Sequence, residues 1–352
     1  MRNNKNILSK LFRLNEWLLV KLLLNLAIGI FLLLSADVKP VAMAMPVMLI
    51  MLYITTVGAF GYFINDLFDK ETDLRSGKTD KKIHLSLFAR IIIPICLLLA
   101  ASTPYVFLLE APGKYLVFLF VHAALLFTYS VPGIKLKTNI LALLWDALYS
   151  YVMPAIITLE IVRQCCVIHD LTMTQKIVPI IWLLLIGIRS LLNHQLKDIK
   201  ADTMAGIKTF VITTGSKTAY SISVIVTSLE IIIFAILVIA IFDVLWKIVI
   251  LALLLFAVVE IILLNKTFNK MFNDGKIWAI INQFYDYYLF MGILLWMAWK
   301  IHPAFVVVPV FFIIYRLSAH TWFYHHFILW FYFKIRGAES KIAENRKKKS
   351  SD

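Results

Sequence analysis

Acidic side chains are concentrated where a long apolar segment ends, from Asn65 to Thr79. Asp66, Asp69 and Asp73 are spaced so that on a helix their three carboxylates would share one face. Like charges on one stripe repel each other, and a bound cation removes that repulsion. The spacing therefore predicts a cation site at this point of the chain.

The same pattern occurs a second time, in a stretch that begins at His194 and again follows an apolar run. When Asp69 is placed over Asp198, Asp73 falls on Asp202, and a glycine follows at the same distance in both stretches. His194 precedes Asp198 by one helical turn, so its imidazole could hydrogen-bond that carboxylate. This internal repeat favours a shared function over two unrelated solvated helix ends.

The composition places most of the chain in a lipid bilayer. Of its 352 residues, 61% are hydrophobic and only 16% are charged, whereas a soluble domain carries roughly 25% charged residues. Pro303, Pro309 and Arg316 interrupt the last apolar run, which is therefore either a kinked span or a re-entrant segment. We predict an all-α fold, a polytopic bundle of transmembrane helices, with spans near 15–35, 41–67, 87–109, 114–131, 139–161, 176–196, 217–241, 246–265, 277–300 and 304–333.

The distribution of Lys and Arg predicts the orientation of these spans. Most of the 35 basic residues fall in segments on one side, which by the positive-inside rule is the cytoplasm. We therefore expect the N-terminus and both acidic stretches on the cytoplasmic face of a plasma or inner membrane. The basic tail over 334–352 is expected beside anionic lipid head groups, and the net charge of +14 does not indicate a nucleic-acid partner.

Carboxylate and amide oxygens at two helix ends are ligands suited to Mg²⁺. This hard cation is usually held by one or two carboxylates together with substrate phosphates. The predicted metal ligands are Asn65, Asp69, Asp73, Asp198 and Asp202, and the predicted catalytic residues are these four aspartates together with Asp66.

Basic side chains lie close to both acidic stretches in the sequence. Acids that hold Mg²⁺, beside bases that contact oxyanions directly, are typical of a diphosphate site. Cleavage of an allylic carbon–oxygen bond leaves negative charge on the departing diphosphate, which the metal and the bases would stabilise. Besides Asn65, the predicted diphosphate-binding residues are Arg75, Lys78, Lys135, Lys137, Lys197 and Lys208.

These motifs resemble those of the UbiA superfamily of intramembrane aromatic prenyltransferases. The resemblance covers about residues 15–300, and its three pieces stand in the family's order. They are Asn65-Asp66-x2-Asp69-x3-Asp73, the loop Tyr129-Ser130-Val131-Pro132-Gly133-Ile134-Lys135-Leu136-Lys137, and Asp198-x3-Asp202 followed by Ala205-Gly206-Ile207-Lys208-Thr209.

The resemblance implies nine helices around a large cavity with a cytoplasmic cap. It also implies that the signature Asn and Asp residues bind a prenyl diphosphate through Mg²⁺, that the isoprenoid tail lies among the helices, and that a lipophilic acceptor attacks the allylic cation. The acceptor is aromatic or a quinone precursor in many members, but two motif variations, 74–80 and His194-Gln195, do not favour a ubiquinone or menaquinone pathway. We therefore predict a UbiA-like domain over 1–300, an additional membrane segment over 301–333 and the tail over 334–352.

Ionisable and aromatic residues within the predicted spans leave two further interpretations open. Asp146 could face the cavity and orient an acceptor, whereas Tyr285, Tyr287 and Tyr288 either mark the membrane interface or stack on an allylic cation. Asp146 and Asp286 could instead line the path of a transporter or channel. A transport path should place its acids near the middle of the bilayer, whereas the densest acidic cluster here lies at one edge.

Overall fold

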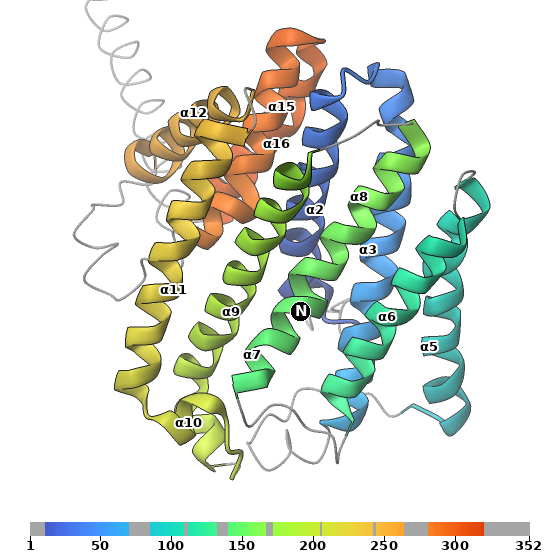
Figure 1. Ribbon diagram of the computed structural model, residues 1–352, viewed down its shortest axis with the longest axis vertical. Coiled ribbons are helices and arrows are strands. Elements are labelled where there is room, and N and C mark those ends of the chain that lie inside the picture. Colours follow the sequence, from blue (N-terminus) through green and yellow to red (C-terminus); the bar gives the residue numbers. More distant parts are fainter. Residues whose placement is uncertain are drawn as a thin grey trace, which may run out of the picture.

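The computed structural model describes residues 11–69, 85–108, 112–131, 140–166, 172–204, 206–241, 244–263 and 281–319. Within these ranges every regular element is a helix, which confirms the predicted all-α class. The α-helices, labelled in Figure 1, are α2 (Leu14–Ser35), α3 (Pro40–Phe68), α5 (Leu87–Ser102), α6 (Pro112–Ser130), α7 (Ile140–Ala147), α8 (Met153–Cys166), α9 (Met173–Met204), α10 (Phe210–Thr214), α11 (Ser216–Ile236), α12 (Leu245–Phe256), α15 (Leu289–Lys300) and α16 (Val307–Ala319).

Shorter 3₁₀ and π segments extend several of these helices. The 3₁₀ segments are η1 (Thr103–Phe107) and η7 (Pro303–Val306). The π segments, which have wider turns, are η3 (Leu148–Val152), η4 (Leu237–Ile241), η5 (Ala257–Leu263) and η6 (Phe284–Tyr288).

Seven helices of the described residues are long and apolar enough to cross a membrane, so the protein is an integral membrane protein. They match the first seven predicted spans and cover Glu16–Ser35, Pro40–Phe68, Leu87–Phe107, Pro112–Ser130, Leu141–Cys166, Met173–Met204 and Ser216–Ile239. The predicted spans 246–265, 277–300 and 304–333 lie partly outside the described residues, and their described parts are helical.

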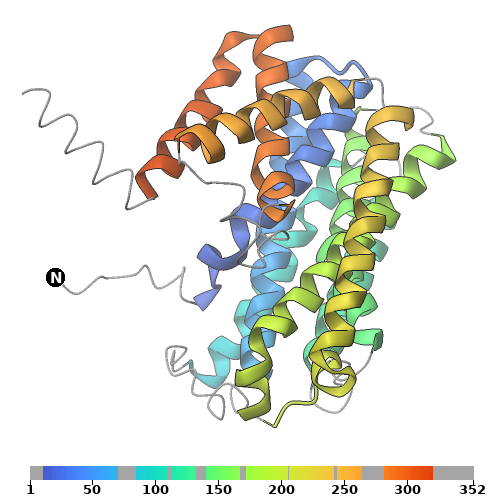
Figure 2. The same cartoon turned by 90° about the vertical axis from the view of Figure 1, so that its left-hand side faces the viewer.

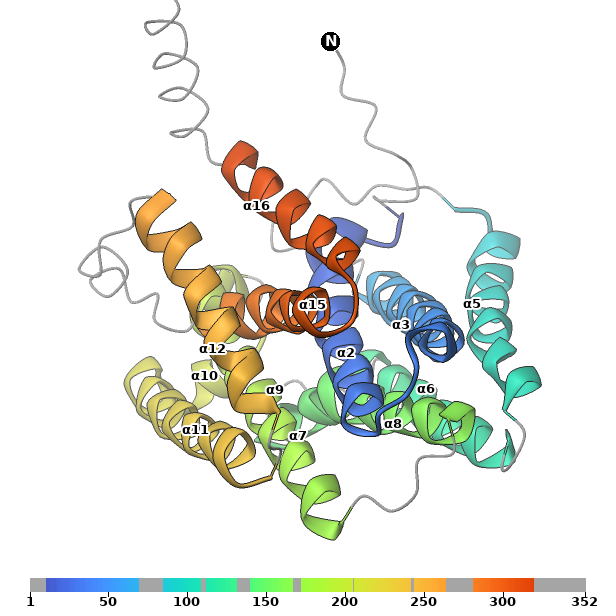
Figure 3. The ribbon, with the colours of Figure 1, turned by 90° about the horizontal axis from the view of Figure 1, so that it is seen from above.

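Helix α2 lies at the centre of the bundle. It packs against α3, α8, α15 and η6, as the view along the helices shows (Figure 3). Leu24 and Leu33 of α2 are almost completely buried by these neighbours, whereas α5, α11 and α16 lie at the periphery. In Figures 1 and 2, α12, α15 and α16 occupy one half of the molecule, and the C-terminal ends of α3 and α9 lie in the other half.

The two acidic stretches differ in how their helices end. Helix α3 ends at Phe68 and Asp69 is its C-cap, so of the three acids that would share a helical face only Asp66 lies within α3. Carboxylates in the last turn face the negative end of the helix dipole, which disfavours continuing the helix through an acidic run. Asp73 itself lies outside the described residues. By contrast, α9 continues to Met204 and carries Asp198 and Asp202 as predicted.

Gly187 allows α9 to pack directly against α7. A Cβ atom at Gly187 would lie 2.5 Å from the Cα atom of Ala147. Backbone atoms cannot move aside as a flexible side-chain end can, so this contact requires glycine. The contact places Asp146, next to Ala147, on the helix that borders α9.

We therefore predict that Gly187→Ala lowers the free energy of unfolding by about 1–3 kcal/mol, because the added methyl group overpacks the contact between α7 and α9. Thermal unfolding of the purified protein in detergent measures this effect. Gly113→Ala is the matched control, since a Cβ atom there meets nothing within 4 Å. Equal melting of the two variants would contradict the prediction.

Candidate functional site

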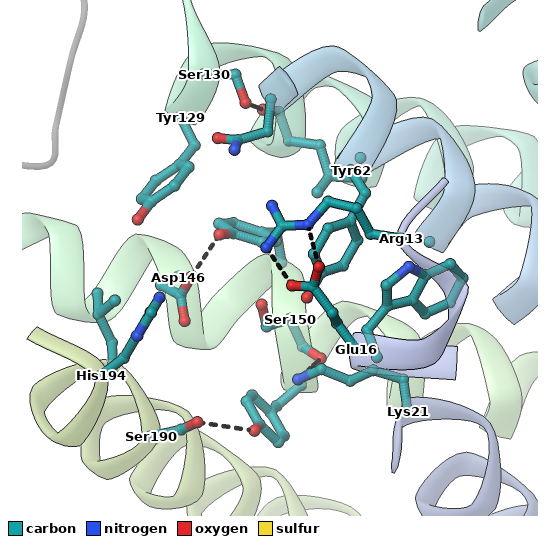
Figure 4. A pocket seen from close by; sticks show the side chains of 18 of the residues that line it. Arg13, Glu16, Lys21, Tyr62, Tyr129, Ser130, Asp146, Ser150, Ser190 and His194 are labelled. Carbon is teal, nitrogen blue, oxygen red and sulfur yellow. Dashed lines mark hydrogen bonds and ion pairs between the residues drawn. The ribbon is translucent and has the colours of Figure 1, made fainter. Parts of the chain in front are cut away.

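A cavity of about 900 Å³ opens between α2, α3, α6, α7, η3, α9 and the turn that precedes α10. Side chains from both acidic stretches line it, although α3 and α9 are far apart in the chain. Figure 4 shows residues of its wall from α2, α3, α6, α7, η3 and α9 converging on one space. The predicted site residues that line the cavity are Asn65, Asp69, Asp198, Asp202 and Lys208.

Two other predicted site residues lie elsewhere. Asp66 pairs with Arg13, whose Nη1 atom lies 3.3 Å from its Oδ1 atom, and Asp66 is not among the residues that line the cavity. Lys197 does not line the cavity either. The remaining predictions, Asp73, Arg75, Lys78, Lys135 and Lys137, lie outside the described residues.

A tight turn after α9 directs the following residues to the cavity. Gly206 has a φ of +68°, a left-handed conformation that favours glycine, and the Ile207 N–H donates to the Asp202 carbonyl over 2.9 Å. Lys208 and Thr209 follow and both line the cavity. The glycine shared by the two sequence stretches therefore has a structural role at least in the second one.

His194 and Gln195 are consecutive residues of α9, about 100° apart around the helix, and they have different surroundings. His194 is exposed, and its Nδ1 atom lies 3.7 Å from Oδ2 of Asp198, on the predicted face but too far for a hydrogen bond. Gln195 is buried, and its side-chain oxygen accepts from the Val211 N–H over 3.3 Å, which ties α10 to α9.

The acidic residues of the cavity fit a metal that is shared with a ligand. In the part of the chain that the structure describes, no three His, Cys, Asp or Glu side chains are grouped to hold a metal by themselves. Mg²⁺ usually takes one or two protein carboxylates and completes its shell with phosphate and water oxygens. Asp69 with Asn65 from α3, and Asp198 with Asp202 from α9, are donor sets of this kind.

Arg13 lines the cavity, although no sequence motif indicated this residue. Burial opposes its charge, but the hydrogen bond to Glu16 and the charge of Asp66 outweigh burial and raise the pKa of Arg13 above its ordinary value. Its guanidinium also lies over the Tyr62 ring, which stacks on Trp17. Arg13 is therefore a fixed cation at the level of the first acidic stretch.

A buried histidine joins three helical segments at the cavity. The His122 Nε2–H donates to the Tyr149 carbonyl over 2.7 Å, so Nδ1 is the acceptor of the Tyr53 hydroxyl at 2.6 Å. Both ring nitrogens are used, and the imidazole is neutral in this arrangement. The sequence motifs did not indicate His122; an ionisable residue inside an apolar span is the signal that would have indicated it.

Asp146 lines the cavity, as predicted, and accepts a hydrogen bond from the Tyr149 hydroxyl. The carboxylates of Asp69, Asp146 and Asp202 all act electrostatically on the phenol of Tyr129. Asp146 thus belongs to the same electrostatic environment as both acidic stretches.

The aromatic residues around Asp286 do not line the cavity. Tyr285 packs edge-on against Trp182, and the Tyr288 hydroxyl donates to Glu260 over 2.6 Å, with Tyr285 and Tyr288 buried. Tyrosines that mark a membrane interface are exposed to lipid head groups, whereas these two are buried inside the protein. Their contacts serve the packing of η6.

Neither a family model nor a curated protein sequence matches this chain. Solved structures do match it. A UbiA homologue from Archaeoglobus fulgidus bound to GPP and Mg²⁺ is 16% identical, with 81% of this chain and 99% of that chain covered and a TM-score of 0.55. The chain has the UbiA fold.

Two further structures support this assignment of the UbiA fold. The same homologue bound to DMAPP and Mg²⁺ is 15% identical, with 88% and 98% covered and a TM-score of 0.53. A structure of digeranylgeranylglyceryl phosphate synthase is 18% identical, with 81% and 97% covered and a TM-score of 0.53. The predicted resemblance is therefore confirmed for the fold.

We predict that Tyr53→Phe destabilises the protein by about 1–3 kcal/mol, because it leaves the buried Nδ1 atom of His122 without its donor. Chemical or thermal unfolding in detergent measures the change. Tyr105→Phe removes the same hydroxyl at an exposed position and serves as the control. A loss of stability in both variants alike would show that the hydrogen bond to His122 is not the cause.

Proposed function

We propose that this protein is an integral-membrane prenyltransferase that transfers an isoprenoid group from a prenyl diphosphate to a lipophilic acceptor, with Mg²⁺ as its cofactor. One observation carries the proposal: Asn65 and Asp69 from one helix, and Asp198 and Asp202 from another, line the same cavity. The UbiA fold supports it, since structures of a UbiA homologue with that fold hold GPP or DMAPP together with Mg²⁺.

The cavity residues have distinct roles in this reaction. Asn65 and Asp69 hold one side of the diphosphate site, and Asp198 and Asp202 hold the other. Bound Mg²⁺ supplies positive charge that offsets the charge of the departing diphosphate. Lys208 donates to the diphosphate oxygens. Asp73, Arg75, Lys78, Lys135 and Lys137, which lie outside the described residues, remain predicted contributors.

The bond changes follow from the substrate. The allylic carbon–oxygen bond breaks, and its electron pair leaves with the diphosphate. The acceptor forms a new bond to the allylic carbon and loses a proton. The ring of Tyr149 lines the cavity and stabilises the allylic cation by cation–π attraction, while Asp146 orients the acceptor.

The Lys and Arg distribution supports a cytoplasmic position for the site. The N-terminus and both acidic stretches then face the cytoplasm, where the soluble diphosphate product is released. The membrane itself contributes lipid around the apolar helix faces and allows a lipophilic acceptor to enter from the bilayer.

The positions of the buried charged side chains favour the prenyltransferase over the transporter alternative. Glu230 is completely buried against Arg189, with a 2.5 Å contact, and neither side chain lines the cavity. Glu260 likewise accepts from Tyr288. A transport path needs such acids to be accessible along it, whereas these are used in helix packing.

We predict that Asp69→Ala, Asp198→Asn and Asp202→Ala each lower Mg²⁺-dependent transfer by roughly 10²-fold or more, since each removes ligation of the charge that develops on the diphosphate. The measurement is incorporation of label from radiolabelled geranyl diphosphate into the lipid extract of membranes, with Mg²⁺ and after its removal by EDTA. Asp37→Asn, a change at an exposed acid outside the cavity, should keep wild-type transfer. Full Mg²⁺-dependent transfer by any of the three cavity variants would defeat its assignment.

Two lysines near the end of α9 provide a second test. Lys208 lines the cavity and Lys197 does not, so Lys208→Ala should weaken geranyl diphosphate binding about 10- to 100-fold, the value of a charge-assisted hydrogen bond. Lys197→Ala should bind as the wild type does. Equilibrium binding of the labelled diphosphate in Mg²⁺ measures both, and equal affinities of the two variants would remove Lys208 from the site.

A further inference from the structure

A cluster of lysines and tryptophans lies at the end of the bundle opposite the two acidic stretches. Helix α9 ends beside the acidic stretches, and α11, which is long and apolar enough to cross the membrane, leads from that end to the start of α12. Helices α12 and α15 lie side by side (Figures 1 and 3). The Lys–Trp cluster consists of Trp246 and Lys247 in the first turn of α12, and of Trp296, Trp299 and Lys300 near the end of α15.

Gly292 brings the two halves of this cluster together, because it lets α15 approach the backbone of α12. A Cβ atom at Gly292 would lie 2.7 Å from the carbonyl oxygen of Ile248, and a backbone atom cannot move aside as the end of a side chain can. Lys247 precedes Ile248, and Trp296 follows Gly292 by about one helical turn. The lysine of one helix and the tryptophan of the other are therefore held at the same level of the bundle.

The ring of Trp296 is shared by both lysines of the cluster. The Lys247 ammonium lies 5.7 Å from its centre and the Lys300 ammonium lies 5.6 Å from it. Lys300 also lies 4.2 Å from the centre of the Trp299 ring, which packs edge-on against Trp296. The two positive charges are thus held near each other by an aromatic wall.

These two charges have no anionic partner in the part of the chain that the structure describes. Neither Lys247 nor Lys300 forms an ion pair there, whereas Lys114 at the same end of the bundle pairs with Glu160 over 3.3 Å. Lys247 also lies in the first turn of α12, where the helix dipole disfavours a cation. A bound anion would offset the repulsion between the two lysines.

The surroundings of the cluster indicate the class of this anion. Trp299 is 69% exposed and Trp246 is 47% exposed, and tryptophans are enriched where a membrane protein meets the lipid head groups. Ile250, Leu253 and Leu254 are exposed as well, and their spacing from Trp246 places all four on one face of α12. An anion at the cluster would therefore lie at one end of an apolar helix face, as the phosphate of a phospholipid lies at one end of its acyl chains.

We propose that the Lys–Trp cluster binds the phosphate group of an anionic phospholipid, whose acyl chains lie along the exposed apolar face of α12. The ammonium groups of Lys247 and Lys300 contact the phosphate oxygens. A zwitterionic lipid binds less tightly, because its own cationic group is repelled by the second lysine. This site is separate from the proposed prenyl transfer, since no residue of the cluster lines the cavity.

Lipid binding to the purified full-length protein in neutral detergent tests this proposal. Native mass spectrometry compares phosphatidylglycerol with phosphatidylcholine that has the same acyl chains. We expect the wild type to bind phosphatidylglycerol roughly ten-fold or more tightly than phosphatidylcholine, as two lysines near one phosphate would give. The double variant Lys247→Met, Lys300→Met should lose this preference, whereas Lys247→Arg, Lys300→Arg should retain it.

Lys176→Met is the matched control, because Lys176 is an exposed lysine in the first turn of α9, at the same end of the bundle, and belongs to no such cluster. It should keep the preference for phosphatidylglycerol. Equal affinity of the wild type for the two lipids would overturn the proposal. So would a preference that survives in Lys247→Met, Lys300→Met, or one that Lys176→Met loses to the same extent.

Tryptophan fluorescence locates the bound lipid without any change of charge. Phosphatidylglycerol with brominated acyl chains quenches tryptophans near those chains. We expect the quenched fraction to be smaller in Trp246→Phe and in Trp299→Phe than in the wild type, and the difference to vanish with brominated phosphatidylcholine at the same concentration. Equal quenching of the wild type and both variants by the brominated phosphatidylglycerol would place the lipid elsewhere and overturn the site, even if the double lysine variants failed to fold.

Discussion

The placement of carboxylates at the negative ends of two helices is the constraint on which this structure depends. Asp66 and Asp69 end α3, and Asp198 and Asp202 lie near the end of α9, so the helix dipoles add to the repulsion between the acids. Arg13 compensates Asp66. The other three acids line one cavity together with Lys208, and a cation bound between them would offset their mutual repulsion.

The bundle holds these helix ends in position through contacts on the far side from the cavity. Arg189 donates to Glu230 of α11, with both side chains completely buried, and to the partly buried Asn282 before η6. Asp198 follows Arg189 by nine residues, about two and a half turns, so the two side chains project from opposite faces of α9. The buried interaction thus fixes the rotation of α9, and Gly187 fixes its distance from α7. The acidic face can then meet α3 across the cavity.

Patterns that repeat along the chain were predictable, and single contacts across it were not. The apolar runs predicted the helical membrane fold, and the echo of Asp69 and Asp73 in Asp198 and Asp202 predicted that two stretches converge. Nothing local distinguishes Asp66 from Asp69, because the difference is made by Arg13 from another helix. Lys21 is one polar residue in an apolar run, so no periodicity indicates that it faces the cavity.

The π segment η3 has a consequence for how this chain is compared with others. A π turn accommodates one residue more than the α-helix it interrupts, and η3 separates Asp146 from α8. Loss of a single residue between Leu148 and Val152 would restore regular winding and leave Asp146 on nearly the same face relative to α8, because the wider turn takes up the extra residue. An alignment of this chain with relatives therefore has to allow a one-residue gap in this segment. Without it, residues that face the cavity would be matched with residues that face lipid.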